Sequence, residues 1–423
     1  MQKLGLLVIG VAGLIAACGS SGGKPKTDGG PAKDAGPAND AGPTCPAPFD
    51  GSASLAVTRP NPLISLGMPA FASPNANQAT LVTNGVYHNG GWNAGNPTPA
   101  TPSWVAIKLT AGPTRVLLSW DDGGTYGYDY KTYINPPPQT VYGMPTEYHI
   151  DVSADSTNGS DGTWTTVVPT VENEVRTRAH SFDFAGMSWV KMVITNSPGD
   201  MPDAGLKEPG GVVIGQIDVH ELSATGSCLP DDTWFFMGDS ITAFAYDRAA
   251  AHQPSFAAGI NAAHPAYFPA MINGGIGSEK SGDGLARLQN ALDWNPDFRF
   301  FLLGYGTNDA AGGQISTYTF QMNLQQMIDM IRAAGRVPII PHIPYSSEAS
   351  HSDIPQYNAV IDQLTTANGL LPGADLYTSL MTNAATDFPC GCAGRSTDYI
   401  HPNDVGLAAM NALWTTQMSP LYH

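Results

Sequence analysis

The stretch TWFFMGDSIT, residues Thr233 to Thr242, decides the fold. Its first half is a short apolar run typical of a buried strand, and the run stops at Gly238 and Asp239 before a polar turn. A serine at the point where a buried strand ends and a helix begins has an exposed hydroxyl and a free backbone N–H. Ser240 is therefore the candidate nucleophile, although an isolated Gly-Asp-Ser is more often an ordinary exit from a strand.

Three further segments follow in a fixed order. They are INGGIGSEKSGDGLARL (Ile272 to Leu288), FRFFLLGYGTNDA (Phe298 to Ala310) and STDYIHPNDVG (Ser396 to Gly406). The first two are apolar strands that run into glycine-rich turns, and the third places Asp398 and His401 three residues apart before the last helix. In a parallel sheet the ligand crevice lies at the carboxyl ends of the strands, so we expect the chemistry to collect there.

His401 is the candidate base for Ser240. A serine hydroxyl is a poor nucleophile at neutral pH, and imidazole is the side chain that titrates nearest the working range. Asp398 can reach back to one ring nitrogen and leave the other to face Ser240. A lone Asp-x-x-His is more often a capped loop or part of a metal site, so the catalytic interpretation depends on the ordered set of segments.

Together the four segments resemble the four sequence blocks of the SGNH (GDSL-type) hydrolases, over Thr233 to the C-terminus. The resemblance implies a three-layer, flavodoxin-like α/β fold and a serine esterase. It also implies an oxyanion hole made by the backbone N–H groups of Ser240 and Ser278 and by the side-chain amide of Asn308. The family usually has glycine where this chain has Ser278. The N–H survives that change, but the geometry of the turn comes into question.

From Pro230 onward apolar strands alternate with helical patterns, which predicts a parallel sheet covered on both faces. The strands are expected near Thr233–Met237, Pro269–Asn273, Phe298–Leu303 and Val337–Ile340. A helix is expected over Thr317 to Ala334, with Phe320, Leu324, Met327, Ile328 and Ile331 on its buried face. Asp239 and Asp309 are expected to shape turns. His342 lies at a strand end, where it lines the substrate pocket or is an ordinary structural histidine.

The bulk composition excludes some functions. The chain has 423 residues and a formal net charge of −17, from 36 acidic and 19 basic residues, which disfavours nucleic acid as a partner. The length suggests two or three domains, and a hydrophobic content of 42% is enough for substantial cores. No cofactor is expected for catalysis, because no cluster of His and Asp residues in the sequence indicates a required metal.

Residues 1–18 form a predicted targeting segment, with Lys3 before an apolar run that ends at Cys18. The run is too short for a spanning helix, and its end resembles a bacterial lipoprotein signal. That resemblance implies lipidation of Cys18 and a location in the bacterial cell envelope, with the membrane contacted only through the lipid. Gly19 is compatible with the outer membrane. The alternative is an ordinary secretory signal and an extracellular protein.

Residues 19–45 form a predicted linker rich in Gly, Pro, Ala and Asp, which contains a six-residue repeat from Asp28 and cannot build a core. Residues 46–228 show short alternating strands separated by turn residues, which favours a β-sandwich. Residues 229–423 form the hydrolase domain.

The order of strands and turns in the sandwich, from GMPAFAS at Gly67 to IGQIDVHEL ending at Leu222, resembles a discoidin-like, galactose-binding-like module. This implies an all-β jelly roll, a carbohydrate-binding role and a possible structural calcium. An insertion from Asp121 to Gly143 carries tyrosines that could stack on sugar faces or cover neighbouring parts of the protein, among them Tyr126, Tyr128 and Tyr130. Trp104, Trp164 and Trp189 are expected in the core.

Five cysteines fit an oxidising compartment, with Cys18 lipidated and four left to pair. Cys45 and Cys228 bracket the predicted sandwich, so a bridge between them is preferred, with Cys390 and Cys392 closing a local loop. Zinc binding by the Cys-Gly-Cys pair is less favoured because no second pair lies nearby.

The first functional hypothesis is an esterase that deacetylates a polysaccharide, with the sandwich docking the polymer. This choice of substrate rests on domain pairing. A lipase or phospholipase-like esterase of the same superfamily is the alternative, and a non-catalytic surface adhesin is a third.

Overall fold

The computed structural model describes residues 55–86, 91–110, 112–122, 143–173, 175–197, 211–225, 228–246, 250–390 and 397–423. The predictions for the targeting segment, the linker and the tyrosine insertion lie outside these residues, and so do those for Cys18, Cys45 and Cys392. Within the described ranges, no helix combines the length and the apolar character needed to cross a bilayer.

The N-terminal part contains two antiparallel sheets. One has the order β1 (Ala70–Ser73), β3 (Ser103–Lys108), β8 (Trp189–Asn196), β5 (Glu147–Ser153) and β6 (Thr165–Glu172). The other has the order β2 (Trp92–Gly95), β9 (Val212–Glu221), β4 (Arg115–Asp122) and β7 (Thr177–Asp183). Strand β7 was not expected from the sequence, because His180 and Arg178 interrupt its apolar pattern.

The two sheets share one core, to which alternate residues of each strand contribute. Val105 and Ile107 of β3 are in it, whereas Trp104, the residue before Val105, is only half-buried on the opposite face. Trp164 is half-buried too, so the prediction that both tryptophans are core residues is wrong. Trp189 is 1% exposed, but it is covered on the outer face, where it contacts Phe71 at 5.4 Å between ring centroids.

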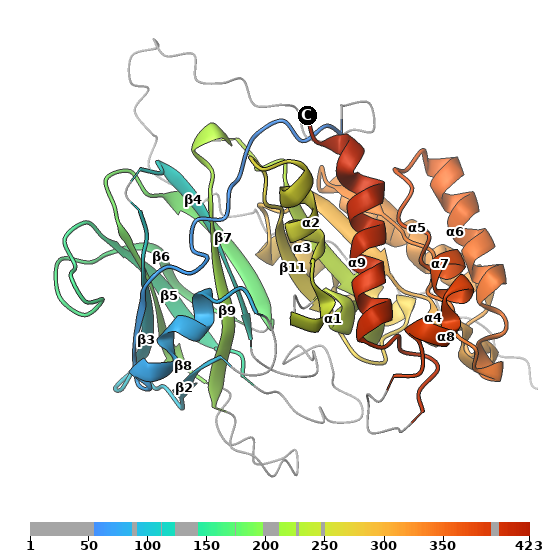
Figure 1. Ribbon diagram of the computed structural model, residues 1–423, viewed down its shortest axis with the longest axis horizontal. Coiled ribbons are helices and arrows are strands. Elements are labelled where there is room, and N and C mark those ends of the chain that lie inside the picture. The colour runs from blue at the N-terminus through green and yellow to red at the C-terminus, as the bar shows by residue number, and fades with distance from the viewer. Residues whose placement is uncertain are drawn as a thin grey trace, which may run out of the picture. The chain divides into compact units, whose positions relative to one another are not determined.

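The C-terminal part is built on a parallel sheet with the order β11 (Ala270–Gly275), β10 (Thr233–Gly238), β12 (Phe300–Gly304) and β13 (Val337–Ile339). These strands match the predicted ones to within two residues at each end. Figure 1 shows helix α9 running alongside α1 and α2. The helices are α1 (Ser240–Ala245), α2 (Phe256–Ala263), α3 (Ser281–Trp294), α4 (Thr307–Ala310), α5 (Thr317–Ala333), α6 (Ile354–Asn368), α7 (Leu376–Thr382), α8 (Ala384–Asp387) and α9 (Asp404–Met418).

Each face of this sheet has its own core, because side chains alternate along the strands. Phe235 and Met237 of β10 pack with residues of α3, α5 and α6, whereas Trp234 and Phe236 pack with residues of α1, α2 and α9. All five residues predicted for the buried face of α5 are buried. The result is a helix–sheet–helix arrangement.

The two parts are joined by specific contacts. Strand β4 and strand β7 of the sandwich lie against the edge strand β11. Asn295, after α3, accepts the N–H of Ala179 at 3.2 Å, and Asp297 accepts the N–H of Ser181 at 3.2 Å. The segment at residues 55–61 precedes the sandwich but contacts the hydrolase part, where Val57 is in the α1, α2 and α9 core.

Cys228 and Cys390 are each disulfide-bonded. The preferred pairings with Cys45 and Cys392 stay predictions.

Gly259 sets the approach of α2 to α9. A Cβ at this position would lie 2.4 Å from Thr415 Oγ1 and 2.8 Å from Thr415 Cγ2. Gly259→Ala is therefore expected to lower the free energy of unfolding by about 1–3 kcal/mol, because the two helices must separate.

Urea denaturation of Gly259→Ala, Thr415→Ala and the double variant measures this coupling. Thr415→Ala removes both clashing atoms, so the double variant should recover most of the loss. Gly282→Ala is the matched control: its Cβ meets nothing closer than 3.5 Å, so it should be neutral or stabilising. Equal losses for Gly259→Ala with and without Thr415 would contradict the explanation.

Candidate active site

Ser240 is the first residue of α1, directly after β10. Asp239 occupies the N-cap position in an extended conformation, and its Oδ1 accepts the N–H of Ile241 at 2.9 Å. This cap starts the helix one residue after the strand ends, so Ser240 stays at the surface of the turn and is half-buried. The local sequence alone accounts for this placement.

A continuous line of hydrogen bonds runs from Asp398 to Ser240. Asp398 Oδ2 lies 2.8 Å from His401 Nδ1, and His401 Nε2 lies 2.7 Å from Ser240 Oγ. The structure therefore brings together the three residues that the sequence singled out as nucleophile, base and orienting carboxylate. The distances are within the range of direct hydrogen bonds, so no bridging water is needed.

Asp398 is held from several sides. Its Oδ1 accepts the N–H groups of Ile400 at 2.8 Å and His401 at 3.1 Å, and its backbone pairs with disulfide-bonded Cys390. Asp398 is 1% exposed, and burial opposes its ionisation. The hydrogen bonds from His401 and the two N–H groups outweigh burial and hold the pKa of Asp398 below its ordinary value. The carboxylate therefore stays charged beside the imidazole.

Two neighbours fix the His401 loop. Phe244, one turn after Ser240 on α1, packs edge-on against the His401 ring with 5.4 Å between centroids. Asn403 caps α9 by accepting the N–H groups of Val405 and Gly406, at 3.0 and 3.2 Å. The contact of Phe244 with the His401 ring was not expected from the sequence.

Ser278 adopts the backbone conformation that glycine favours. Its φ is 67°, in the left-handed region, and the residue is exposed. A left-handed turn is thus formed here with a side chain present. Because a non-glycine residue in this conformation costs about 1–2 kcal/mol, the surrounding contacts must hold the turn in place.

Asn308 lies at the start of α4, after β12. Its Nδ2 donates to the backbone oxygen of Glu279 at 2.9 Å. A side-chain amide carries two N–H groups, so this bond fixes the plane of the amide beside the Ser278 turn and leaves one N–H to donate elsewhere. The two predicted oxyanion-hole segments after β11 and β12 therefore contact each other directly.

The two aspartates of the motifs are buried and shape turns, as expected. Burial raises the pKa of Asp239 to about 7, and nearby Asp309 acts in the same direction. Asp309 accepts both the N–H of Ser281, at 3.0 Å, and its hydroxyl, and burial raises its pKa as well. Asp309 thereby fastens the start of α3 to α4.

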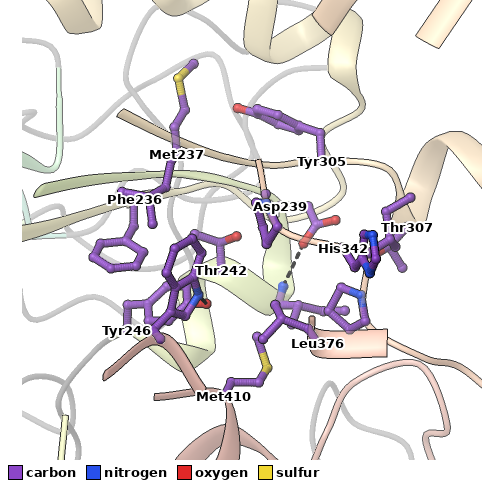
Figure 2. Close-up of a pocket in the computed structure, with 17 residues that line it drawn as sticks. Phe236, Met237, Asp239, Thr242, Tyr246, Tyr305, Thr307, His342, Leu376 and Met410 are labelled. Atoms are coloured by element: carbon purple, nitrogen blue, oxygen red, sulfur yellow. Dashed lines mark hydrogen bonds between the residues drawn. The ribbon is translucent and has the colours of Figure 1, made fainter. Parts of the chain in front are cut away.

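A small cavity lies behind the nucleophile. Its lining includes Asp239 and Ile241, the two neighbours of Ser240, but not Ser240 itself. Figure 2 shows Asp239 between Thr242 on one side and Thr307 and His342 on the other, with its hydrogen bond dashed. Most of the lining is apolar, and it comes from the carboxyl ends of β10 and β12, from the segment after β13, and from α1, α7 and α9.

His342 lines this cavity and is bonded at both ring nitrogens. Nδ1 lies 3.0 Å from Asp375 and Nε2 lies 2.9 Å from Asp362. Partial burial opposes its protonation, but the two carboxylates outweigh burial and raise the pKa of His342. The position at a strand end was predicted correctly, and the two carboxylate partners are those of a structural histidine. Tyr126, Tyr128 and Tyr130 lie outside the described residues.

Other residues near the site gave no signal in the sequence. His351 is 4% exposed, and its pKa is lowered by burial and by the nearby His401. Glu279, the residue after Ser278, forms a buried ion pair with Arg287 of α3. Their spacing of eight residues is not a motif. Among the described residues, no group of three or more His, Cys, Asp or Glu side chains is placed to hold a metal ion.

Residues 236–409 match the GDSL-like Lipase/Acylhydrolase family. No curated protein matches the chain. Among solved structures, the chain is similar to a lipase/acylhydrolase from Enterococcus faecalis, with 26% identity over 44% of this chain and 95% of that chain and a TM-score of 0.37. An acetylxylan esterase from Geobacillus stearothermophilus has 16% identity over 44% of this chain and 94% of that chain, with a TM-score of 0.37.

The protein is a hydrolytic enzyme that cleaves esters. Its C-terminal part is a GDSL/SGNH hydrolase domain, preceded by the antiparallel β-rich part.

The raised pKa of Asp239 predicts a pH-dependent stability. In the unfolded chain this carboxyl ionises near pH 4, whereas in the fold it keeps its proton up to about pH 7. The contribution of Asp239 is therefore complete below pH 4 and is lost as the pH rises to 7. Asp239→Asn keeps an acceptor for the N–H of Ile241 but cannot titrate. The free energy of unfolding of this variant, relative to that of wild type, should therefore rise by on the order of 3 kcal/mol from pH 4 to pH 7.

Urea denaturation from pH 4.5 to 7.5 measures that difference. Asp293→Asn, which removes an exposed carboxyl from α3, serves as the control and should run parallel to wild type. A constant difference between Asp239→Asn and wild type would contradict the assignment.

The conformation of Ser278 makes a second prediction. Ser278→Gly should raise the free energy of unfolding by up to about 1 kcal/mol, because relief of the left-handed strain exceeds the added entropy of the unfolded chain. Ser278→Val should lower it by about 1–2 kcal/mol, because a β-branched residue tolerates this φ least. Thermal and urea unfolding of the two variants give the order, and a reversed order would rule out the left-handed turn.

Proposed function

We propose that the protein is a serine esterase that removes acetyl groups from a polysaccharide, with Ser240 as nucleophile, His401 as base and Asp398 as its orienting carboxylate. The observation that carries the catalytic part is the hydrogen-bonded line from Asp398 through His401 to Ser240, with distances of 2.8 and 2.7 Å. Acyl transfer needs a nucleophile, a base and an orienting group that lie within hydrogen-bond distance of one another.

The first half of the cycle forms an acyl-enzyme. His401 Nε2 takes the hydroxyl proton as Ser240 Oγ attacks the ester carbonyl carbon, and the carbonyl electron pair moves to oxygen. The backbone N–H groups of Ser240 and Ser278 and the amide of Asn308 hold that oxyanion. The intermediate collapses, the ester C–O bond breaks, and the leaving alcohol takes the proton from His401.

Water completes the cycle. His401 Nε2 removes a proton from water as its oxygen attacks the acyl carbon, and the same three donors hold the second oxyanion. Collapse releases the acid, and Ser240 recovers its proton from His401. The charged Asp398 stabilises the imidazolium in both halves and keeps the Nδ1 proton in place. The proposed cycle uses no cofactor.

The substrate class rests on the pairing of the two parts. The sandwich contacts the hydrolase domain through β11 and the loop after α3, so a polymer bound to one part stays close to the other. We propose that the sandwich is a carbohydrate-binding module. Lipidation of Cys18 would hold the enzyme on the bacterial envelope. The net charge of −17 repels anionic lipid surfaces and nucleic acid, so it disfavours substrates of these two kinds.

Substitutions in the hydrogen-bonded line test the catalytic part. Ser240→Ala should reduce kcat for an activated acetate ester by about 10⁴-fold or more. Asp398→Asn should reduce it by about 10²–10⁴-fold, because an amide N–H facing Nδ1 selects the tautomer that cannot accept the serine proton. Asp293→Asn is the surface control. An unchanged kcat for Ser240→Ala would refute the assignment.

The substrate is tested separately. NMR of acetate release from several acetylated polysaccharides, with wild type and Ser240→Ala, should show release only by the wild type. Initial rates on esters of increasing acyl length should fall steeply beyond acetyl. A preference for long acyl chains, with no acetate released from any polymer, would favour the lipase-like alternative.

A further inference from the structure

We propose that Arg287, with Glu279 and Tyr305, forms a positioning unit that holds the Ser278 turn in its oxyanion-binding geometry. The inference rests on the proposed function, since it concerns how one donor of that site is kept in place. Ser278 itself does not hold the turn, because its side chain is exposed and its φ of 67° is strained.

Arg287 joins the two ends of the turn. It lies on α3, and its Nη2 donates to the backbone oxygen of Gly274, at the end of β11, at 2.7 Å. Its Nε and Nη2 also donate to the two oxygens of Glu279, each at 2.8 Å. One guanidinium thus spans from the last strand residues before the turn to the first residue after Ser278. A planar, two-pronged donor fixes direction as well as distance.

Tyr305 closes the unit from the far side of β10. It follows β12, and its hydroxyl donates to Glu279 Oε2 at 2.9 Å. A Cβ on Gly284 of α3 would lie 2.3 Å from the Tyr305 ring, so the glycine provides the space that the ring occupies. The backbone oxygen of Glu279 meanwhile accepts from Asn308 at 2.9 Å. Glu279 is therefore the point where the unit meets both proposed donors after β11 and β12.

The burial of these groups favours a positioning role over a stabilising one. Glu279, Arg287 and Tyr305 are 3%, 4% and 2% exposed. Taking an ion pair out of water costs about as much as the pair returns, so such a pair adds little net stability. It does impose one geometry, because each charged group loses its partners if the turn moves. A preorganised donor is what an oxyanion site requires.

The matched comparison is a second buried ion pair. Arg176 and Asp122 lie in the sandwich at 2.9 Å, and Arg176 is 2% exposed. If a buried ion pair mattered only for folding, removing either arginine should lower the melting temperature and leave kcat unchanged. The variants Arg287→Met and Arg176→Met keep most of the side-chain volume, and Tyr305→Phe removes one hydrogen bond with the ring retained.

Steady-state kinetics on an activated acetate ester, well below each melting temperature, test the proposal. Arg287→Met should lower kcat by about 10–100-fold with KM changed less than about threefold, and Tyr305→Phe by about 3–10-fold. Arg176→Met should lower the melting temperature and keep kcat. Arg287→Lys should recover part of the loss, since it restores the charge but not both prongs.

Two outcomes overturn the inference. One is a wild-type kcat for Tyr305→Phe together with a wild-type kcat for Arg287→Met. The other is a fall in kcat that, in each variant, is no larger than its fraction of unfolded protein explains. Arg176→Met shows how much kcat falls when only folding is affected. If Arg287→Met does not fold, Tyr305→Phe decides alone. Ser240→Ala is measured alongside: its full activity would refute the proposed function, whereas its inactivity with unaffected Tyr305→Phe and Arg287→Met would refute only the positioning unit.

Discussion

The arrangement of the site depends on the parallel pairing of β10 between β11 and β12. In this register Gly238 lies opposite Gly275 on one side and Gly304 on the other, so all three strands end at the same level. Their following turns carry Ser240, Ser278 and Asn308, and they meet because parallel strands deliver their carboxyl ends to one edge. His401 comes from the loop before α9, which packs against α1 and α2 on one face of the same sheet.

Buried polar groups near this edge of the sheet hold the turns in place. Asp309 fastens Ser281, Glu279 receives Arg287 and Tyr305, and Asp239 caps α1. Each of these groups is buried, so a displaced turn would leave a desolvated polar atom without its partner. The strained φ of Ser278 is tolerated for this reason. The stability of the site is thus distributed over β11, β12 and α3.

The sandwich and the hydrolase domain are linked more closely than two modules on a tether. The segment at residues 55–61 crosses to the hydrolase, where Thr58 and Arg59 donate to Asp231 and Asn61 donates to the backbone of Asp232. Tyr422, next to the last residue, donates to the carboxyl of Asp232 at 2.6 Å. The chain that precedes the sandwich and the chain that ends the hydrolase therefore converge at the amino end of β10.

The sequence predicted the candidate catalytic residues and the parallel sheet of the C-terminal part. Ser240, Asn308, Asp398 and His401 each follow a local pattern, a strand end or a short turn, and such patterns are set by neighbours in the chain. It also predicted the buried face of α5, because a period of 3.6 residues needs no partner to be recognised. Tertiary structure alone decided which face of β3 is covered, so that Trp104 lies outside the core. Tertiary structure likewise placed Arg287 against Glu279 and Phe244 against His401. The alternation of residues along a strand shows which side chains share a face, but it does not show what packs on that face. A buried ion pair forms only where separate elements meet, and no spacing in the sequence predicts that meeting.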